Sequence, residues 1–283
     1  MNRRELFDRL FKGCTFMALS LSIGVLVAIV FFIALKGISS VNLNFLLSKT
    51  QDFGAQGGIF YQICGSLLIV FFAGLFCFPI AIGAALCNSE WIRNKKAKRF
   101  ASTLIYALNG VPSIVFGIFG LIFFVNYCGM GISWLAGSLV LSFMILPTIM
   151  VSSYNAMNNI PQMYRDSALA LGLNSWQVIT AVILPQSYLG MLSGLFIGLA
   201  RAIGETAPIM FVATAFSGVM IPTSFWEPVS TLPTHILALS QEAINPLALE
   251  NAWGTAWVLI CIVFSFSLIS LWVRIKINAG IIK

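Results

Sequence analysis

The stretch YRDSALALGLNSWQVITAVILP, residues 164–185, decides how the chain is organised, because it separates two apolar segments without being a plain loop. Pro161 suits the first turn of a short helix, and Gly172 suits the left-handed residue that ends it. Asn174 can cap a second helix, with Gln177 three residues later as its partner in a variant of the capping box. We therefore predict two short helices joined by a glycine turn, which protrude from the protein as a docking element.

Composition places the rest of the chain in a lipid bilayer. Of its 283 residues, 59% are hydrophobic and 9% are charged, and the mean hydropathy is +0.95, which is far too apolar for a soluble domain. A helix needs roughly 20 apolar residues to cross the hydrocarbon core. Six runs qualify, at residues 14–35, 59–86, 104–125, 132–154, 186–216 and 253–273. We therefore predict an all-α, polytopic membrane protein with six transmembrane helices. The second and fifth runs exceed the required length, which favours tilt, a kink or extension past the membrane surface.

The net charge of +7 is distributed as membrane topology requires, which argues against a nucleic-acid partner. Outside the apolar runs, only Lys36 and Lys49 lie on one side of a six-span arrangement. The other side carries Arg3, Arg4, Arg9, Lys12, Arg93, Lys95, Lys96, Lys98, Arg99, Arg165, Arg274, Lys276 and Lys283. Loops rich in Lys and Arg remain in the cytoplasm. We therefore expect both termini, the 88–103 loop and the docking element on the cytoplasmic side.

The chain is expected to form one membrane domain that follows a short cytoplasmic N-terminal segment. Residues 1–13 are predicted to be a cytoplasmic N-terminal segment, and residues 14–283 a transmembrane domain that contains the docking loop 155–185. The first apolar run is longer than the roughly 7–15 residues of a signal-peptide core, and no A-x-A site follows it. This favours an uncleaved membrane anchor.

Ionisable side chains enter the membrane in the fifth run, GMLSGLFIGLARAIGETAP. On a helix, Gly190, Gly194, Gly198, Arg201 and Glu205 fall within an arc of about 80°. Glycines four residues apart allow a neighbouring helix to approach closely. A charge at a helix centre costs roughly 2.5–3.5 kcal/mol against lipid, so both charges should face protein or a watery pathway. The pair is then either a static bond that fixes helix register or a gate that guides an anion, and both roles are compatible.

Prolines mark two further positions near the predicted pathway. Pro208 removes the amide hydrogen that would bond to the Gly204 carbonyl, so we predict a loosened turn beside Glu205 and a lined cavity. In NGVPSIVFGIFGLIFFV, residues 109–125, Pro112 falls in the first turn or so of the third span. Ser113 then becomes a candidate to contact a translocated ligand.

No residue pattern predicts a catalytic site or a metal site. His235 is the only histidine, and we interpret it as a surface residue of the outer loop and not as a metal ligand. The six cysteines lack zinc-ligand spacing. Because no segment matches the phosphate-binding pattern GxxxxGK[ST], any ATP and Mg that drive this protein must bind to another chain.

The docking element resembles the coupling loop of ABC-transporter permeases. That family's pattern is EAA, three residues, Gly, nine residues and I-x-LP. It is matched here by Asp166, Ser167, Ala168, Gly172, Val182, Leu184 and Pro185, with Asp166, Ser167 and Val182 departing from the pattern. The resemblance implies the permease fold of type I ABC importers. It also implies that residues 166–172 transmit closure of partner ATPases to the membrane helices.

After Gly57 the chain resembles the A-type permeases of phosphate-specific ABC importers. Similar segments follow in the family's order, namely GGIFYQICGSLLIV, NGVPSIVFGIFGLIFFV, ILPTIM and ARAIGETAP, and the TAP ending favours the A-type over its C-type sister. This resemblance implies a bacterial inner-membrane complex with a C-type permease, two ATP-binding subunits and a periplasmic phosphate-binding protein. Arg201 would attract or gate phosphate, and Glu205 would pair with it or open the path.

One departure leaves the substrate open. After ILPTI the family commonly carries an Arg and, three residues later, a Glu, whereas this chain has Val151 and Tyr154. One alternative is an ABC permease for another oxyanion, such as sulfate, molybdate or phosphonate. The other is a secondary transporter that works without ATP, although such proteins often contain inverted repeats and the sequence shows no clear internal repeat.

Overall fold

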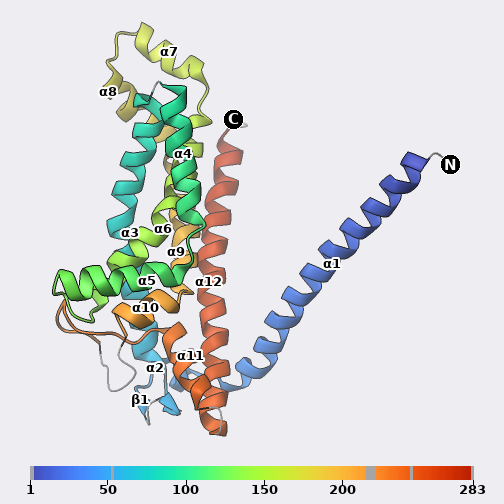
Figure 1. Ribbon diagram of the computed structural model, residues 1–283, viewed down its shortest axis with the longest axis vertical. Helices are drawn as coiled ribbons and strands as arrows, with labels where there is room; N and C mark the ends of the chain where they lie inside the picture. Colours follow the sequence, from blue (N-terminus) through green and yellow to red (C-terminus); the bar gives the residue numbers. More distant parts are fainter. Residues whose placement is uncertain (1–2, 52–53, 93, 215–220, 243–244, 282–283) are drawn as a thin grey trace.

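Four helices, α3, α6, α9 and α12, run along the long axis of the molecule and are joined by shorter pieces at both ends (Figure 1). This computed structural model describes residues 3–51, 54–92, 94–214, 221–242 and 245–281. The α-helices are α1 (Arg3–Gly37), α2 (Leu43–Leu47), α3 (Phe60–Leu86), α4 (Lys95–Asn109), α5 (Ser113–Gly120), α6 (Trp134–Asn158), α7 (Gln162–Ala170), α8 (Ser175–Val178), α9 (Leu184–Ile203), α10 (Ala207–Val212), α11 (Leu232–Gln241) and α12 (Pro246–Ile281). A 3-10 turn, η1 (Ile38–Ser40), and three π-helical turns, η3 (Cys87–Trp91), η4 (Leu121–Tyr127) and η5 (Ile179–Ile183), extend them.

Helix α6 is the centre of the core. It packs against α3 and α9, and also contacts α4, α5 and α10. Its side chains Ile145, Ile149 and Met157 are fully buried, and more of it is buried than of any other described span. The apolar runs of the sequence therefore separate into a central helix that faces protein on most sides and outer helices that leave much of their surface to lipid.

The expected number of spans is confirmed in outline. Five described helices are long and apolar enough to cross a membrane, and a bent pair makes up to six. The long second run continues from α3 into η3, so the extension expected from its length is present. The fifth expected run ends earlier than residue 216, because α9 stops at Ile203 and α10 begins only at Ala207. Phe216 itself lies outside the described residues.

The third expected span is not one straight helix, and this expectation was wrong in form. Helices α4 and α5 meet at an angle of 89° (Figure 1). Pro112 precedes α5 with an extended backbone, and a proline disfavours helical geometry at the residue before it, so the helix stops at Asn109. The Thr148 hydroxyl on α6 lies 3.2 Å from the Asn109 side-chain oxygen and anchors this end of α4. Helix α5 consequently runs across the bundle and not along it.

Helix α1 diverges from the bundle. None of its span is buried, and it contacts α12 near its C-terminal end, where the Phe32 and Trp253 ring centroids are 5.5 Å apart (Figure 1). A side chain at Gly37 would collide with Trp253 and Trp257, so glycine permits this close approach. Residues 3–13 of the predicted cytoplasmic N-terminal segment belong to the same helix.

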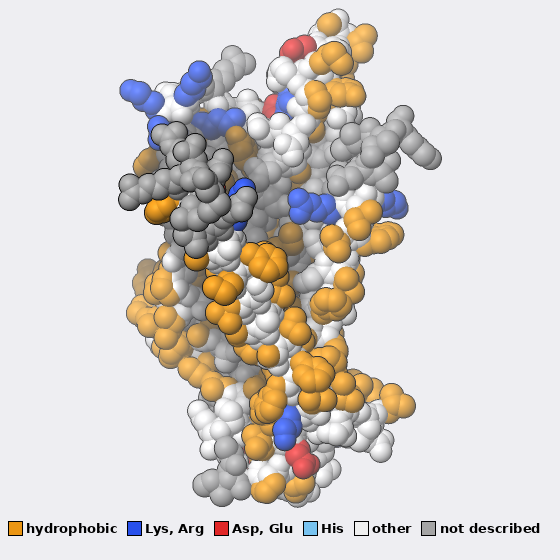
Figure 2. Space-filling model, turned by 90° about the vertical axis from the view of Figure 1, so that its right-hand side faces the viewer, with side chains coloured by type: hydrophobic (Ala, Val, Ile, Leu, Met, Phe, Trp, Pro, Cys, Tyr) orange, Lys and Arg blue, Asp and Glu red, His pale blue; other side chains and the backbone are white. Residues whose placement is uncertain are grey.

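The two ends of the molecule differ. At one end lie α2, α11 and a short antiparallel pair, β1 (Thr50–Gln51) and β2 (Gln56–Gly57), in the register Thr50↔Gly57 and Gln51↔Gln56. At the other end lie α7, α8 and both termini (Figure 1). Figure 2 shows apolar side chains over the middle of one face, with Lys and Arg gathered mainly toward the α7 end. The charge segregation read from the sequence thus corresponds to a spatial separation.

Candidate functional site

Arg201 and Glu205 are loosely paired where α9 ends. Arg201 lies in the last turn of α9, and its Nε is 3.7 Å from Glu205 Oε1. The side chains are 39% and 19% exposed, respectively. At this separation the two groups attract each other without a short hydrogen bond. The arginine is therefore the more exposed member of a loosely held pair.

A complete helix break lies beside this pair. The Gly204 and Glu205 amides donate to the carbonyls of Arg201 and Ala202, both at 3.2 Å, which closes α9 with tight turns. Pro208 then falls in the first turn of α10, where a missing N–H costs nothing. The loosened turn expected at Pro208 is thus a full interruption, and the helix restarts with the proline at its beginning.

The glycine face of α9 lies against α6. A Cβ at Gly190 would lie 2.5 Å from Ala156 Cβ, and one at Gly198 would lie 2.9 Å from Ile149 Cγ1. A Cβ at Gly194, between them, would collide with Ser152. These three positions bring the backbone of α9 close to α6. The same contact fixes where the last turn of α9, and hence Arg201, sits relative to the core.

Ser113 begins α5 and is half-buried. Helix α5 packs against α10, with Gly117 facing Pro208, because a Cβ at Gly117 would lie 2.8 Å from Pro208 Cα. The two interrupted helices, α4–α5 and α9–α10, therefore meet. Among the described residues no hydrogen bond links Ser113 to Arg201 or Glu205, so the fold places Ser113 on the neighbouring interrupted helix and not in contact with the charged pair.

The docking element has the turn chemistry expected from its sequence. Gly172 has a φ of +85°, which confirms the left-handed stop. The Leu173 amide donates to Ala168 O and the Gly172 amide to Leu169 O, which is the Schellman pattern. The predicted capping box is also present, since Asn174 and Gln177 each accept from the other's backbone amide. Pro161 occupies the cap position, one residue before the first turn.

The predicted coupling residues face two directions. Asp166 and Ser167 are exposed, and Asp166 accepts a bond from Gln162 Nε2 at 3.1 Å, whereas Ala168 is buried toward the bundle. Large apolar side chains protrude from the same element, namely Met163, Tyr164, Leu169, Leu171 and Trp176. An exposed cluster of this kind is typical of a surface that binds another protein.

Arg165 makes contacts that the sequence did not predict, because it was interpreted only as one of the cations on the cytoplasmic side. Its Nη1 donates to Ile160 O at 2.7 Å, and its Nη2 donates to Met157 O at 2.8 Å and to Glu90 Oε1 at 3.2 Å. The two ionic side chains are only 12% and 19% exposed. The available signal was its position directly before the EAA-like segment, but its partner Glu90 is remote in sequence.

Tyr154, which occupies the position of the glutamate expected from the family resemblance, makes a cation–π contact. The Lys98 ammonium on α4 lies 5.3 Å from the centroid of the Tyr154 ring on α6. A cation over an aromatic face is attracted by the ring quadrupole. An aromatic ring thus contacts this lysine at the position where the family commonly carries a glutamate, while Val151 packs against the apolar core.

His235 is buried, so its interpretation as a surface residue was wrong. It lies on α11 with 5% exposure, close to Gly54 and 3.5 Å from Gln62 Nε2, and its Nε2 has no partner among the described residues. Burial lowers the pKa of His235 to about 4. Gly54 and Gln62 lie against this side chain, and contact between such distant segments is not visible in a local sequence pattern.

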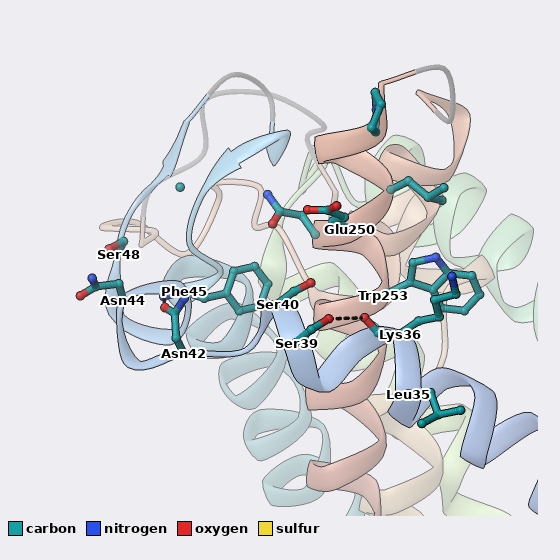
Figure 3. Close-up of a pocket in the computed structure, with 14 residues that line it drawn as sticks. Leu35, Lys36, Ser39, Ser40, Asn42, Asn44, Phe45, Ser48, Glu250 and Trp253 are labelled. Carbon is teal, nitrogen blue, oxygen red and sulfur yellow. Dashed lines mark hydrogen bonds between the residues drawn. The ribbon is translucent and has the colours of Figure 1, made fainter.

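A cavity of about 900 Å³ opens at the end opposite the docking element (Figure 3). It lies where α1 leaves α12, and its polar lining includes Lys36, Asn42, Asn44 and Glu250. This hollow does not include Arg201 or Glu205. It results from the divergence of α1, and we do not assign it to the charged pair.

The chain matches a known family over most of its length. Residues 78–282 match the family described as "Binding-protein-dependent transport system inner membrane component". The chain belongs to this family. It is therefore the permease subunit of an ABC importer, a multi-pass inner-membrane transport subunit and not an enzyme. This role fits partner ATPases and a periplasmic binding protein.

Individual relatives are similar over nearly all of both chains. The chain is 29% identical over 281 residues to "Probable ABC transporter permease protein YqgI" of Bacillus subtilis, covering 95% of each. It is 31% identical over 255 residues to "Phosphate transport system permease protein PstA" of Pasteurella multocida, covering 89% of each.

Solved structures agree on the fold. The inward-facing MetNI methionine ABC transporter superposes with a TM-score of 0.62 at 18% identity, covering 77% of this chain and 95% of that one. A bacterial ABC transporter for the polysaccharide alginate gives 0.62 at 16% identity, covering 94% and 98%. At these identities the likeness concerns the fold alone, and it bears out the expected type I importer architecture.

Proposed function

We propose that this permease subunit carries inorganic phosphate inward across the cytoplasmic membrane by alternating access, with energy from partner ATPases. The observation that carries the proposal is the accessible Arg201 charge at the helix break, held only loosely by Glu205 at 3.7 Å. Similarity to phosphate permeases over most of the chain supports phosphate as the anion.

Arg201 suits an oxyanion because a guanidinium offers a planar fork of N–H donors to phosphate oxygens. Glu205 is both its partner and its competitor. A phosphate that approaches Arg201 must displace this 3.7 Å contact, and its own charge repels the glutamate. The pair can therefore hold the path closed without substrate and release it when the anion arrives.

We assign the remaining partners to the two ends of the molecule and to the unburied surface of α1. We assign the exposed apolar cluster on α7 and α8 to one ATP-binding subunit of a pair. With this assignment, the α7 end and both termini face the cytoplasm, as the charge asymmetry of the sequence predicts. The opposite end, with α2 and α11, then faces a periplasmic phosphate-binding protein. The unburied surface of α1 is available to lipid and to a homologous C-type permease.

The substrate is tested by uptake into proteoliposomes that contain the whole complex, with ATP inside and the binding protein outside. Radiolabelled phosphate should accumulate, and excess unlabelled sulfate, molybdate or methylphosphonate should compete poorly. Stronger competition by one of these oxyanions would transfer the proposal to that anion. Accumulation without ATP would contradict the ATP-driven mechanism.

Coupling through the docking element is tested at Gly172. The substitution Gly172→Val places a β-branched residue at a φ of +85°, which costs roughly 1–2 kcal/mol in backbone strain although the surrounding space is open. ATPase copurification and phosphate-stimulated hydrolysis should fall. Gly172→Asn is the matched control, because asparagine tolerates this conformation and should retain both. Normal coupling in the valine variant would show that the turn is not needed.

A further inference from the structure

Arg165 belongs to the docking helix, yet its side chain turns back into the bundle. It is 12% exposed, although its neighbours on either side, Tyr164 and Asp166, are exposed. Its guanidinium donates to two carbonyls, at 2.7 and 2.8 Å, and to Glu90 at 3.2 Å. A side chain that only docked a partner would leave these donors free.

One of the two carbonyls belongs to the end of α6 and the other lies just beyond it. Met157 lies in the last turn of this helix, and Ile160 follows it, both buried. The last carbonyls of a helix carry partial negative charge, and the Met157 carbonyl also accepts from the Ile160 amide at 3.3 Å. Arg165 therefore caps the central helix of the core with a cation, and it does so from the docking helix.

The carboxylate belongs to the end of α3. Glu90 lies in η3, the π-helical continuation of α3, and it also accepts a bond from the Ser89 hydroxyl at 2.7 Å. One planar guanidinium thus joins three elements, α7, α6 and η3. Its fixed fork makes the joint stiffer than a single flexible ion pair.

The same region contains buried polar atoms without partners. Asn88 Oδ1 on η3 and Ser153 Oγ on α6 have no hydrogen bond among the described residues. A buried polar atom left unpaired carries a desolvation cost. This cost falls on η3 and α6, two of the elements that the guanidinium joins.

We infer that Arg165 is a positioning residue that passes displacement of the docking helix α7 to α3 and α6 together. This inference rests on the proposed docking of an ATPase on α7. Helix α6 in turn contacts the glycine face of α9 through Ser152 and Ala156, and α9 carries Arg201 in its last turn. A continuous packed route therefore links the docking helix to the charged pair.

The test changes the contact between Arg165 and Glu90 and measures coupling separately from assembly of the complex. Glu90→Gln keeps an oxygen that can accept from Arg165 but removes the charge, and Glu90→Ala removes the contact completely. Both variants keep the bonds from Arg165 to the Met157 and Ile160 carbonyls. Glu242→Gln, an exposed acid at the opposite end, is the matched control. The whole complex is reconstituted, and ATPase copurification, ATP hydrolysis and phosphate imported per ATP are measured.

We expect copurification and hydrolysis to stay within about twofold of wild type, while phosphate imported per ATP falls about fivefold in Glu90→Ala and less in Glu90→Gln. The Glu242→Gln ratio should match wild type. An unchanged ratio in Glu90→Ala overturns the inference, and so does loss of copurification in both Glu90 variants, since the joint would then serve assembly only. If the wild-type complex shows no ATPase bound to α7, the proposed function fails instead. Uncoupling by Gly172→Val with normal Glu90 variants refutes this inference alone.

Discussion

Two arginines at different depths of the molecule form ion pairs of different kinds. Arg165 is mostly buried, bonds to two carbonyls and lies 3.2 Å from Glu90, whereas Arg201 is 39% exposed and meets Glu205 only at 3.7 Å. The first directs much of its hydrogen-bonding capacity to protein groups, with bonds to three acceptors. The second keeps much of that capacity for another ligand. This contrast supports the proposal that Arg165 joins structural elements and that Arg201 acts on a substrate.

The largest effect on stability is expected at Arg165. Arg165→Gln leaves Glu90 without its charge partner and removes the guanidinium bonds to two carbonyls. Removing one member of a buried pair costs about 3 kcal/mol. The midpoint of thermal unfolding of the solubilised protein should fall markedly. Arg99→Gln, at an exposed cation on the same end, should leave it nearly unchanged. Equal midpoints for the two variants would show that the contacts of Arg165 do not stabilise the protein.

The contact that carries Arg201 is tested at the glycine face of α9. Gly194→Ala introduces a Cβ that collides with Ser152 on α6, and overpacking of this kind costs about 1–3 kcal/mol. Gly83→Ala is the control, because a Cβ there meets nothing within 4 Å. We expect lower thermal stability and lower phosphate uptake only in the Gly194 variant. A harmless Gly194→Ala would show that the α6–α9 contact does not set the position of Arg201.

His235 on α11, which is more deeply buried than either arginine, extends the comparison to pH. Burial lowers its pKa to about 4, so below pH 6.5 the unfolded chain takes up a proton that the folded chain refuses. The free energy of unfolding should therefore decrease as the pH falls from about 6.5 to 4, by about 1.4 kcal/mol at pH 5.5.

Unfolding midpoints at pH 7.5 and 5.5 check this expectation. His235→Gln, which stays neutral over this range, should show a smaller decrease than wild type. An identical decrease in both proteins would mean that this histidine is not the group that titrates.

Local chemistry was visible in the sequence, and distant pairing was not. The Gly172 turn and the Asn174 cap depend on residues within five positions of each other, and both were predicted. The Arg165–Glu90 pair and the contacts of His235 with Gly54 and Gln62 join segments far apart in the chain, which no local pattern encodes. The bend before Pro112 lies between these cases. The segment NGVP contained the signal of a broken helix, but the apolar run around it outweighed that signal.

The central claim is that Arg201 acts on the anion and not only on Glu205. Its exposure and the 3.7 Å separation predict a stability cost below about 1 kcal/mol for Arg201→Gln. Insertion and assembly should therefore survive while uptake falls. The double variant Arg201→Gln with Glu205→Gln leaves no unpaired charge behind. Uptake should recover in this variant if the pair is purely structural, and should stay low if Arg201 acts on the anion.

The most direct measurement is radiolabelled phosphate uptake by proteoliposomes that carry wild type, Arg201→Gln or the double variant, normalised to the amount of assembled complex. The account predicts low uptake in both variants, with normal complex yield. Near-normal uptake by the double variant would contradict it and would leave Arg201 as a structural partner of Glu205.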